Sequence, residues 1–142
     1  MSEENELTTP QPEGTPLPRP TPLSAPHWEG CQEGEFRVQR CQDCGQWIFI
    51  PQPVCSSCFS EALEWTPTSG KGTVYSYTGL HRPQQPQVRG PYVVAIVEFE
   101  EGFHMLTNLI DIDPDAVKIG MAVEVCFVER SEVITLPYFK PA

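Results

Sequence analysis

The chain has few basic residues for its length. Its 142 residues include 9 lysines and arginines against 19 aspartates and glutamates, which gives a formal net charge of -10. A surface of this sign repels phosphate backbones unless basic residues are gathered in a separate patch. The composition therefore argues against a nucleic-acid partner and fits a protein partner better.

The sequence also lacks a long apolar run. No stretch approaches the roughly 18 apolar residues that a membrane-spanning helix needs. The N-terminus, residues 1–6, is acidic, whereas a secretory signal peptide begins with basic residues and continues with apolar ones. We therefore expect no membrane insertion, and the cysteine pattern described below makes the cytoplasm the expected compartment.

A catalytic constellation is missing as well. The histidines are His27, His81 and His104, and none stands with a serine, cysteine or carboxylate in a recognisable activating motif. His104 lies in a predicted strand, where a hydrogen-bonded or half-exposed histidine is commoner than a general base. Cys126 lies in the apolar run 123–128, which predicts a buried, inert thiol. We therefore expect the chain not to be an enzyme by itself.

Four cysteines form the most informative pattern that the sequence contains. Cys41, Cys44, Cys55 and Cys58 make two Cys-x-x-Cys pairs with ten residues between them. A two-residue spacer lets both sulfurs of a pair face one point, and two such pairs on facing hairpins predict a tetrahedral structural zinc site. Four thiolates leave no position for water or substrate, so we do not expect a catalytic metal. Two disulfides are the alternative, and the pattern does not distinguish zinc from iron.

Composition divides the chain into three parts. Residues 1–23 hold six of the sixteen prolines and little apolar periodicity, which predicts a disordered or polyproline-like tail. Residues 24–66 are predicted to form a short helix, capped by Ser24 and ended by Gly34, and then a zinc ribbon. Cys31 is expected to be buried on this helix and not to be a fifth ligand. Residues 67–142 are predicted to form a separate barrel.

Strands separated by turn residues fill this C-terminal part. Alternating or β-branched segments predict five strands, at 72–81, 92–99, 103–110, 123–128 and 133–136. Glu101-Gly102 is the expected turn between the second and third strands, and Asp113 begins a single helical turn before the fourth. This order is typical of the OB-fold. The predicted fold class is therefore mainly β: a short helix, a zinc ribbon and a five-stranded OB-fold barrel.

The segment 81–91, between the first two predicted barrel strands, is the candidate binding loop. It carries Arg82 and Arg89, and OB-folds commonly bind ligands through this loop. We predict that it contacts a ligand or a partner, and a solvated loop is the alternative. Tyr75 and Tyr77 could form the base-stacking platform of a nucleic-acid OB-fold, but the scarcity of basic residues favours packing in the core or in an interface.

Several segments resemble one known family. They are residues 34–36, 39–45, 55–58, 69–77, 91–95, 101–102, 119–121 and 136–141. On these segments the chain resembles the acyl-CoA-associated OB-fold proteins with an N-terminal rubredoxin-like zinc ribbon, known as the domain of unknown function 35 family. The likeness extends from about residue 24 to the C-terminus. One departure is the stretch 50–53, Ile-Pro-Gln-Pro, where relatives usually carry an arginine after the proline.

The resemblance implies a role that the residues alone do not show. Members of this family are similar to small partner subunits of thiolase-like enzymes, which act on CoA thioesters. The resemblance thus implies a non-catalytic accessory subunit in a hetero-oligomer, which helps to form the CoA-ester site of its partner. A retro-aldolase of steroid side-chain degradation is the favoured specific partner. The alternative function is an OB-fold protein that binds single-stranded nucleic acid, which the net charge disfavours.

The predicted ribbon is rich in aromatic residues, namely Trp47, Phe49, Phe59 and Trp65. This is more apolar surface than so small a module can hide by itself, and exposed apolar patches usually mark an interface. We therefore predict that this face docks the partner enzyme, with Trp47 and Phe59 among the contact residues. The alternative is that Trp47 and Trp65 pack between ribbon and barrel.

Overall fold

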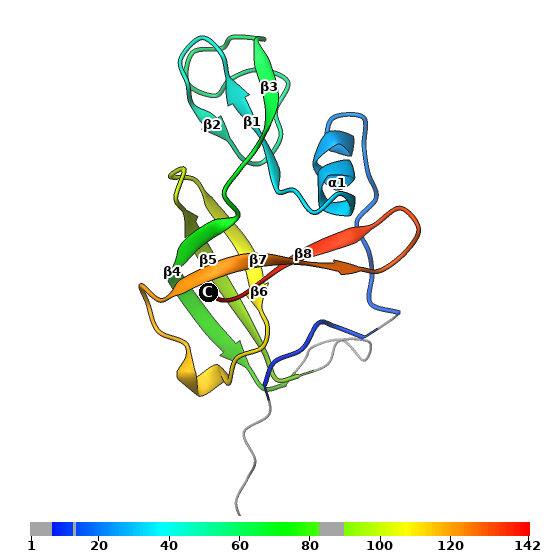
Figure 1. The fold of residues 1–142 in the computed structure, drawn as a ribbon, viewed down its shortest axis with the longest axis vertical. Helices are drawn as coiled ribbons and strands as arrows, with labels where there is room; N and C mark the ends of the chain where they lie inside the picture. The colour runs from blue at the N-terminus through cyan, green and yellow to red at the C-terminus, as the bar shows by residue number, and fades with distance from the viewer. Residues whose placement is uncertain (1–6, 13, 83–89) are drawn as a thin grey trace, which may run out of the picture.

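The computed structural model describes residues 7–12, 14–82 and 90–142 of the chain. Figure 1 shows two β modules one above the other, with a single helix beside the upper one. The upper module is a small three-stranded sheet, and the lower module is a closed barrel. None of the described helices is long and apolar enough to cross a membrane. The predicted class, mainly β with a ribbon before a barrel, is confirmed.

The helix α1, Ala25–Gln32, forms where the sequence predicts it. Gly34 follows with a φ of +78°, a left-handed conformation that ends helices and that glycine adopts without a Cβ clash. Cys31 is buried on the inner face, as expected. The predicted cap is wrong in detail, because the Ser24 side chain makes no capping bond to the helix and its Oγ accepts from the Thr21 amide at 2.9 Å.

The ribbon sheet has the strand order β2-β1-β3, with β1 at Arg37–Cys41, β2 at Trp47–Ile48 and β3 at Leu63–Pro67. The strand β3 is not predicted by the sequence. It pairs antiparallel with β1 along its whole length, from Arg37↔Pro67 to Cys41↔Leu63. This pairing returns the chain to the start of β1, where the barrel begins.

The barrel has the strand order β4-β5-β6-β8-β7 and is closed. Its strands are β4 at Lys71–Leu80, β5 at Tyr92–Phe99, β6 at His104–Leu109, β7 at Ala122–Glu129 and β8 at Thr135–Pro141. The 3-10 turn η1, Pro114–Ala116, lies between β6 and β7, and the Asp113 side chain accepts from the Asp115 amide. This arrangement is the OB-fold order that the sequence predicts.

The last strand is longer than predicted and contains two prolines. The sequence indicates a strand at 133–136, whereas β8 runs to Pro141 and pairs Pro137 with Phe127 on β7. Proline lacks an amide donor and is tolerated where one side of a strand has few ladder bonds. In the described residues β8 pairs with its other neighbour, β6, only at Leu109↔Phe139. One side of β8 therefore has few ladder bonds, and the prolines are tolerated.

The barrel core extends into the start of the ribbon. Alternate residues of β5 face inward and are at most 2% exposed, namely Val93, Ala95, Val97 and Phe99. Phe36, just before β1, joins the same cluster and lies with its ring centroid 5.0 Å from that of Phe99. The Phe36 carbonyl accepts from both the amide (2.9 Å) and the hydroxyl (2.8 Å) of Thr68. Ribbon and barrel are therefore joined by a shared core and by two hydrogen bonds from Thr68 to Phe36.

Tyr75 and Tyr77 do not pack in the core, contrary to one of the two predictions made for them. Tyr75 is 54% exposed and Tyr77 40% exposed. The register of β4 against β5 shifts between Val74 and Ser76, which leaves Tyr75 at a β-bulge on the outside. There its ring lies 4.6 Å from that of His104.

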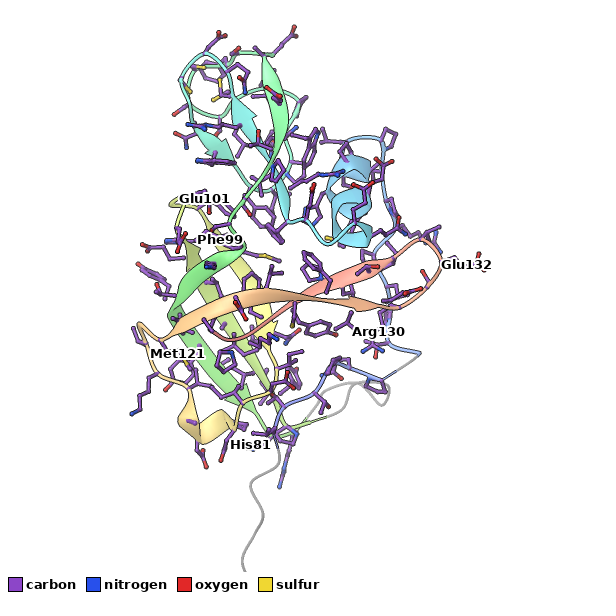
Figure 2. The ribbon with its side chains drawn as sticks, viewed as in Figure 1. His81, Phe99, Glu101, Met121, Arg130 and Glu132 are labelled. Atoms are coloured by element: carbon purple, nitrogen blue, oxygen red, sulfur yellow. The ribbon has the colours of Figure 1, made fainter. Side chains whose placement is uncertain are left out.

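The expected disordered tail is wrong for residues around Thr8, which is only 2% exposed. The Thr8 amide donates to the Ile112 carbonyl, and the Thr8 carbonyl accepts from the Asp111 amide, each at 2.8 Å. Further along, the Gln11 amide donates to the Tyr138 hydroxyl, and the Arg130 guanidinium donates to the Gln11 carbonyl. Figure 2 labels Arg130 beside this segment. A proline-rich chain is already extended, so fixing it against the barrel costs less conformational entropy than fixing an ordinary coil.

Candidate metal centre

The two Cys-x-x-Cys pairs fold into two turns of the same geometry. In each turn the residue after the second cysteine has its amide bonded to the carbonyl of the first, as in Gly45 to Cys41 (2.9 Å) and Phe59 to Cys55 (3.0 Å). The amide of each first cysteine is also bonded, to Gln46 and to Ser60 respectively. Both turns thus hold their sulfurs toward one point, as the two-residue spacer predicts.

The four sulfurs lie at the spacing of a tetrahedral zinc site. Their atoms are all within 4.8 Å of one another, with 3.5 Å between Cys41 and Cys58 and 3.6 Å between Cys44 and Cys55. Zinc bonded to four sulfurs at about 2.3 Å requires sulfur separations of about 3.8 Å. Disulfides are excluded at these distances, since an S–S bond is about 2.05 Å long.

Backbone amides favour the thiolate form of the first cysteine in each pair. The amide of Cys44 donates to the Cys41 sulfur at 3.5 Å, and this bond is the main reason why the pKa of Cys41 is lowered to about 6. The pKa of Cys55 is likewise lowered, chiefly by the amide of Cys58. Thiolates are the form that binds metal. Hydrogen bonding within the turns therefore prepares Cys41 and Cys55, the first ligand of each pair.

The centre replaces a hydrophobic core in this part of the molecule. Cys41 and Cys55 are buried together with Ile48, and half-buried Leu63 packs against them. The other two ligands, Cys44 and Cys58, are exposed at the tip. The Ser60 hydroxyl donates to the Asp43 carboxylate and so ties the two turns together. A shell of four thiolates is closed, so the centre is structural and has no position for a substrate.

Phe59 lies beside the centre and is one of the predicted partner contacts. It is 76% exposed, and its φ is +62°. The equivalent position in the first turn is Gly45, with a φ of +77°. A left-handed backbone costs a residue with a Cβ roughly 1–2 kcal/mol, which glycine avoids. The second turn therefore carries an exposed aromatic ring at a position where glycine would be more stable.

The other predicted contact residues are placed differently. Trp47 is half-buried against the barrel core, as is Phe49. Arg40 lies over the Trp47 ring, 5.0 Å from its centroid. Arg82 is exposed at the end of β4, and Arg89 lies outside the described residues. In the described residues, no contact joins Arg82 to Trp47 or to Phe59.

His27 is a residue that the sequence does not single out as part of a site. It is 7% exposed, and its ring lies against Trp28 and Phe36. Its Nδ1 donates to the Arg37 carbonyl at 3.0 Å, and its Nε2 lies 3.8 Å from the Cys31 sulfur. Loss of hydration on burial lowers its pKa. His27 thus joins α1 to β1 as a neutral side chain. The sequence gives no signal of this contact beyond the separation of ten residues between His27 and Arg37.

The described residues show no catalytic arrangement around the other histidines. The His104 Nε2 lies 3.1 Å from the Glu98 carboxylate, and both side chains are about half exposed. This is the hydrogen-bonded strand histidine that the sequence predicts. Cys126 is only partly buried, whereas the sequence predicts a buried thiol. It lies on β7, which has fewer buried residues than β5.

Comparison with protein families assigns both modules. Residues 28–64 match the rubredoxin-like zinc ribbon domain of ChsH2, and residues 65–128 match its C-terminal OB-fold domain. The match supports zinc as the structural metal of the four cysteines. It also divides ribbon from barrel within β3, close to the predicted boundary at residue 66.

Individual relatives are subunits or scaffolds. A DUF35 domain-containing scaffold protein of Methanocaldococcus jannaschii is 39% identical over 110 residues, 72% of this chain and 78% of that protein. A probable enoyl-CoA hydratase alpha subunit of Thermomonospora curvata is 39% identical over 81% of this chain, which spans only 36% of that protein. A benzoylsuccinyl-CoA thiolase subunit, BbsA of Geobacter metallireducens, is 36% identical over 49% of this chain and 47% of its own.

A solved structure agrees with this assignment. The structure described as the Ltp2-ChsH2(DUF35) aldolase matches 88% of this chain and 98% of its own, with a TM-score of 0.80 and 37% identity. The two family matches follow the order of ribbon and barrel found in this chain. The chain therefore belongs to the ChsH2/DUF35 family of proteins with a rubredoxin-like zinc ribbon and an OB-fold.

Proposed function

We propose that the chain is a non-catalytic accessory subunit that binds and stabilises a thiolase-like enzyme acting on acyl-CoA. The closed four-cysteine centre carries this proposal, because it organises the ribbon without offering a reactive position. The relatives support it, since one is named a scaffold, one a thiolase subunit and one part of an aldolase complex. A retro-aldolase of steroid side-chain degradation in the cytoplasm is the specific case that we favour.

Phe59 supports a docking role for the tip of the ribbon. Its ring is exposed and its backbone is in a left-handed conformation that glycine would occupy more stably. Aromatic residues, phenylalanine among them, are enriched in the buried cores of protein interfaces. We therefore keep Phe59 as a partner contact, and the part of Trp47 that is not packed against the barrel core remains a second candidate. Arg82 and Arg89 remain candidates for a contact with a CoA phosphate.

Co-expression with the cognate thiolase-like enzyme tests the proposal. We expect the two chains to elute together and the enzyme to be more soluble or more active in the complex. Phe59→Ser should weaken the complex by about tenfold or more, as for an interface hot spot. Ile119→Ser is the matched control, because Ile119 is also strongly exposed, at 70%, but lies on the barrel. Separate elution and unchanged enzyme activity would contradict the proposal.

The exposed tyrosines favour a second candidate function, the binding of single-stranded nucleic acid. Tyr75 and the neighbouring His104 present aromatic rings on the outside of the barrel, as nucleic-acid OB-folds do. The net charge of -10 opposes this function. A gel shift with single-stranded oligonucleotides at low salt separates the two, and we expect no shift for the wild-type chain.

A further inference from the structure

A groove runs between the ribbon, helix α1 and the barrel. Its walls come from residues 18–24, from α1, from the turn after β2 and from strands β6 and β8, and it encloses about 540 Å³. This volume is within the range of small-molecule sites. In the described residues β6 and β8 pair only at Leu109↔Phe139, so the two strands separate beyond this point and the groove lies along the split.

The lining of the groove is mainly apolar. Trp28 comes from α1, Ile50 from the turn after β2, and Leu106 from β6. Ile50 and Leu106 are each 68% exposed, although each is a large aliphatic side chain. Two such side chains from separate modules that face one groove form an apolar patch that an occupant would cover.

Most polar side chains of the groove already have hydrogen-bond partners. His27 donates to the Arg37 carbonyl at 3.0 Å, and the Asn108 amide donates to the Val93 carbonyl at 3.1 Å. The Tyr138 hydroxyl accepts from the Gln11 amide. A polypeptide in the groove would need side-chain or backbone partners for its own amides, whereas a hydrocarbon would not. The lining therefore suits a hydrocarbon better than a peptide.

The charge of the groove lining favours an anionic group on the bound molecule. Among the described residues that line the groove, Arg19 is the only charged side chain, and it is exposed at the rim. Carboxylates are absent from this described lining, although the chain has 19 aspartates and glutamates. An anionic group on the occupant would meet a guanidinium without opposing acidic side chains.

We propose that this groove binds a small apolar molecule that carries one anionic group. The hydrocarbon part lies among Trp28, Ile50 and Leu106, and the anion pairs with Arg19. The wall at residues 18–24 precedes the segment matched by the zinc-ribbon family, residues 28–64, so the site uses chain outside the two family matches. The proposal does not rest on the proposed function, because ligand binding is measured on the isolated chain.

Titration with 11-bromoundecanoic acid tests the proposal, because bromine quenches tryptophan fluorescence at short range. Trp28 lines the groove, whereas Trp47 and Trp65 do not. We expect saturable, partial quenching in the wild-type chain. Trp28→Phe should bind the acid with similar affinity in calorimetry but lose this quenching.

Two pairs of charge variants locate the hydrocarbon and the anion. Leu106→Glu should weaken binding at least tenfold, whereas Ile119→Glu, at a position of similar exposure on the barrel, should not. Arg19→Glu should weaken binding of the acid by about three- to tenfold but leave the neutral 11-bromoundecanol nearly unaffected. Lys118→Glu is the charge-matched control, since Lys118 is exposed and does not line the groove.

Three results would overturn the proposal. The first is the absence of saturable binding up to the solubility limit of the acid. The second is quenching that persists unchanged in Trp28→Phe, which would place the acid elsewhere. The third is equal loss of affinity in Leu106→Glu and Ile119→Glu. Co-elution with a thiolase-like enzyme can succeed or fail independently of all three.

Discussion

The ribbon and the barrel hold their chains together by different means. The barrel buries a cluster that includes four alternate residues of β5 together with Phe36 and Phe139. The buried cluster at the tip of the ribbon consists of Cys41, Ile48 and Cys55. Apolar burial contributes about 25 cal/mol per Å², and so few side chains cannot offset the ordering of a module of this size. The difference teaches that the ribbon tip depends on metal and the barrel on hydrophobic burial.

The largest effect should follow removal of a metal ligand. Cys44→Ser should abolish stoichiometric zinc binding, because metal-binding free energy is folding free energy in such modules, on the order of 10 kcal/mol. Hydrogen exchange should show loss of protection in residues 37–63, while β5 and β7 remain protected. Cys126→Ser is the control. Full zinc content, or unfolding of the whole chain, would remove the distinction between the modules.

Phe36 should give the next largest effect, because it belongs to the barrel core although it precedes the ribbon. It is 2% exposed, and Phe36→Ala should lower the free energy of unfolding by about 3–5 kcal/mol. Phe59→Ala, at a residue 76% exposed, is the matched control and should change it by less than about 1 kcal/mol. Chemical denaturation of the zinc-loaded chain measures both, and similar losses would show that the shared core is absent.

His27 should make the junction of α1 and β1 sensitive to pH. Burial lowers its pKa below the ordinary 6.5. As pH falls, His27 is therefore protonated in the unfolded chain at a higher pH than in the folded chain. The contribution of neutral His27 to the free energy of unfolding is fully present above pH 6.5. It is lost as pH falls toward the pKa of the folded state, by about 1.4 kcal/mol for each unit by which that pKa is lowered. The stability of wild type relative to His27→Gln should therefore fall between pH 7 and 5. A difference independent of pH would contradict this.

The smallest expected effect is a gain. Phe59→Gly relieves a φ of +62° and should stabilise the ribbon by up to about 1 kcal/mol, although glycine also gains entropy in the unfolded chain. Thermal unfolding of the zinc-loaded chain, followed at the ribbon, measures the change. A loss of stability would mean that the Phe59 ring makes contacts that compensate for its backbone. Gly45→Ala is the opposite control and should destabilise the first turn.

The sequence predicts features that depend on short spacings and misses those that depend on distant partners. The Cys-x-x-Cys pairs and the barrel strands bounded by Gly102 and Gly120 are local patterns, and both are found as predicted. The strand β3 is missed because Leu63–Pro67 has no clear alternation and forms only against β1. Thr8 is missed for the same reason, since its partners Asp111 and Ile112 lie about a hundred residues away.

The candidate site divides in the same way. The four ligands follow from their spacing, whereas the orientation of the aromatic residues does not. Phe49 turns toward the barrel because Phe36 and Phe103 provide rings for it to pack on, with centroids 6.1 and 5.7 Å away. Trp47 packs against the same core cluster. Tyr75 faces outward in simple alternation with the buried Val74, whereas the register shift between Val74 and Ser76 is not revealed by the sequence.

The paired bonds from Thr68 to the Phe36 carbonyl have a consequence for binding kinetics. They close the ribbon onto the barrel at the point where a flexible joint would otherwise let the two modules swing. A partner that touches both modules then meets them already at a fixed angle and loses little rotational freedom of one against the other on docking. Loosening this joint with Thr68→Gly should slow productive association even if every contact residue is unchanged.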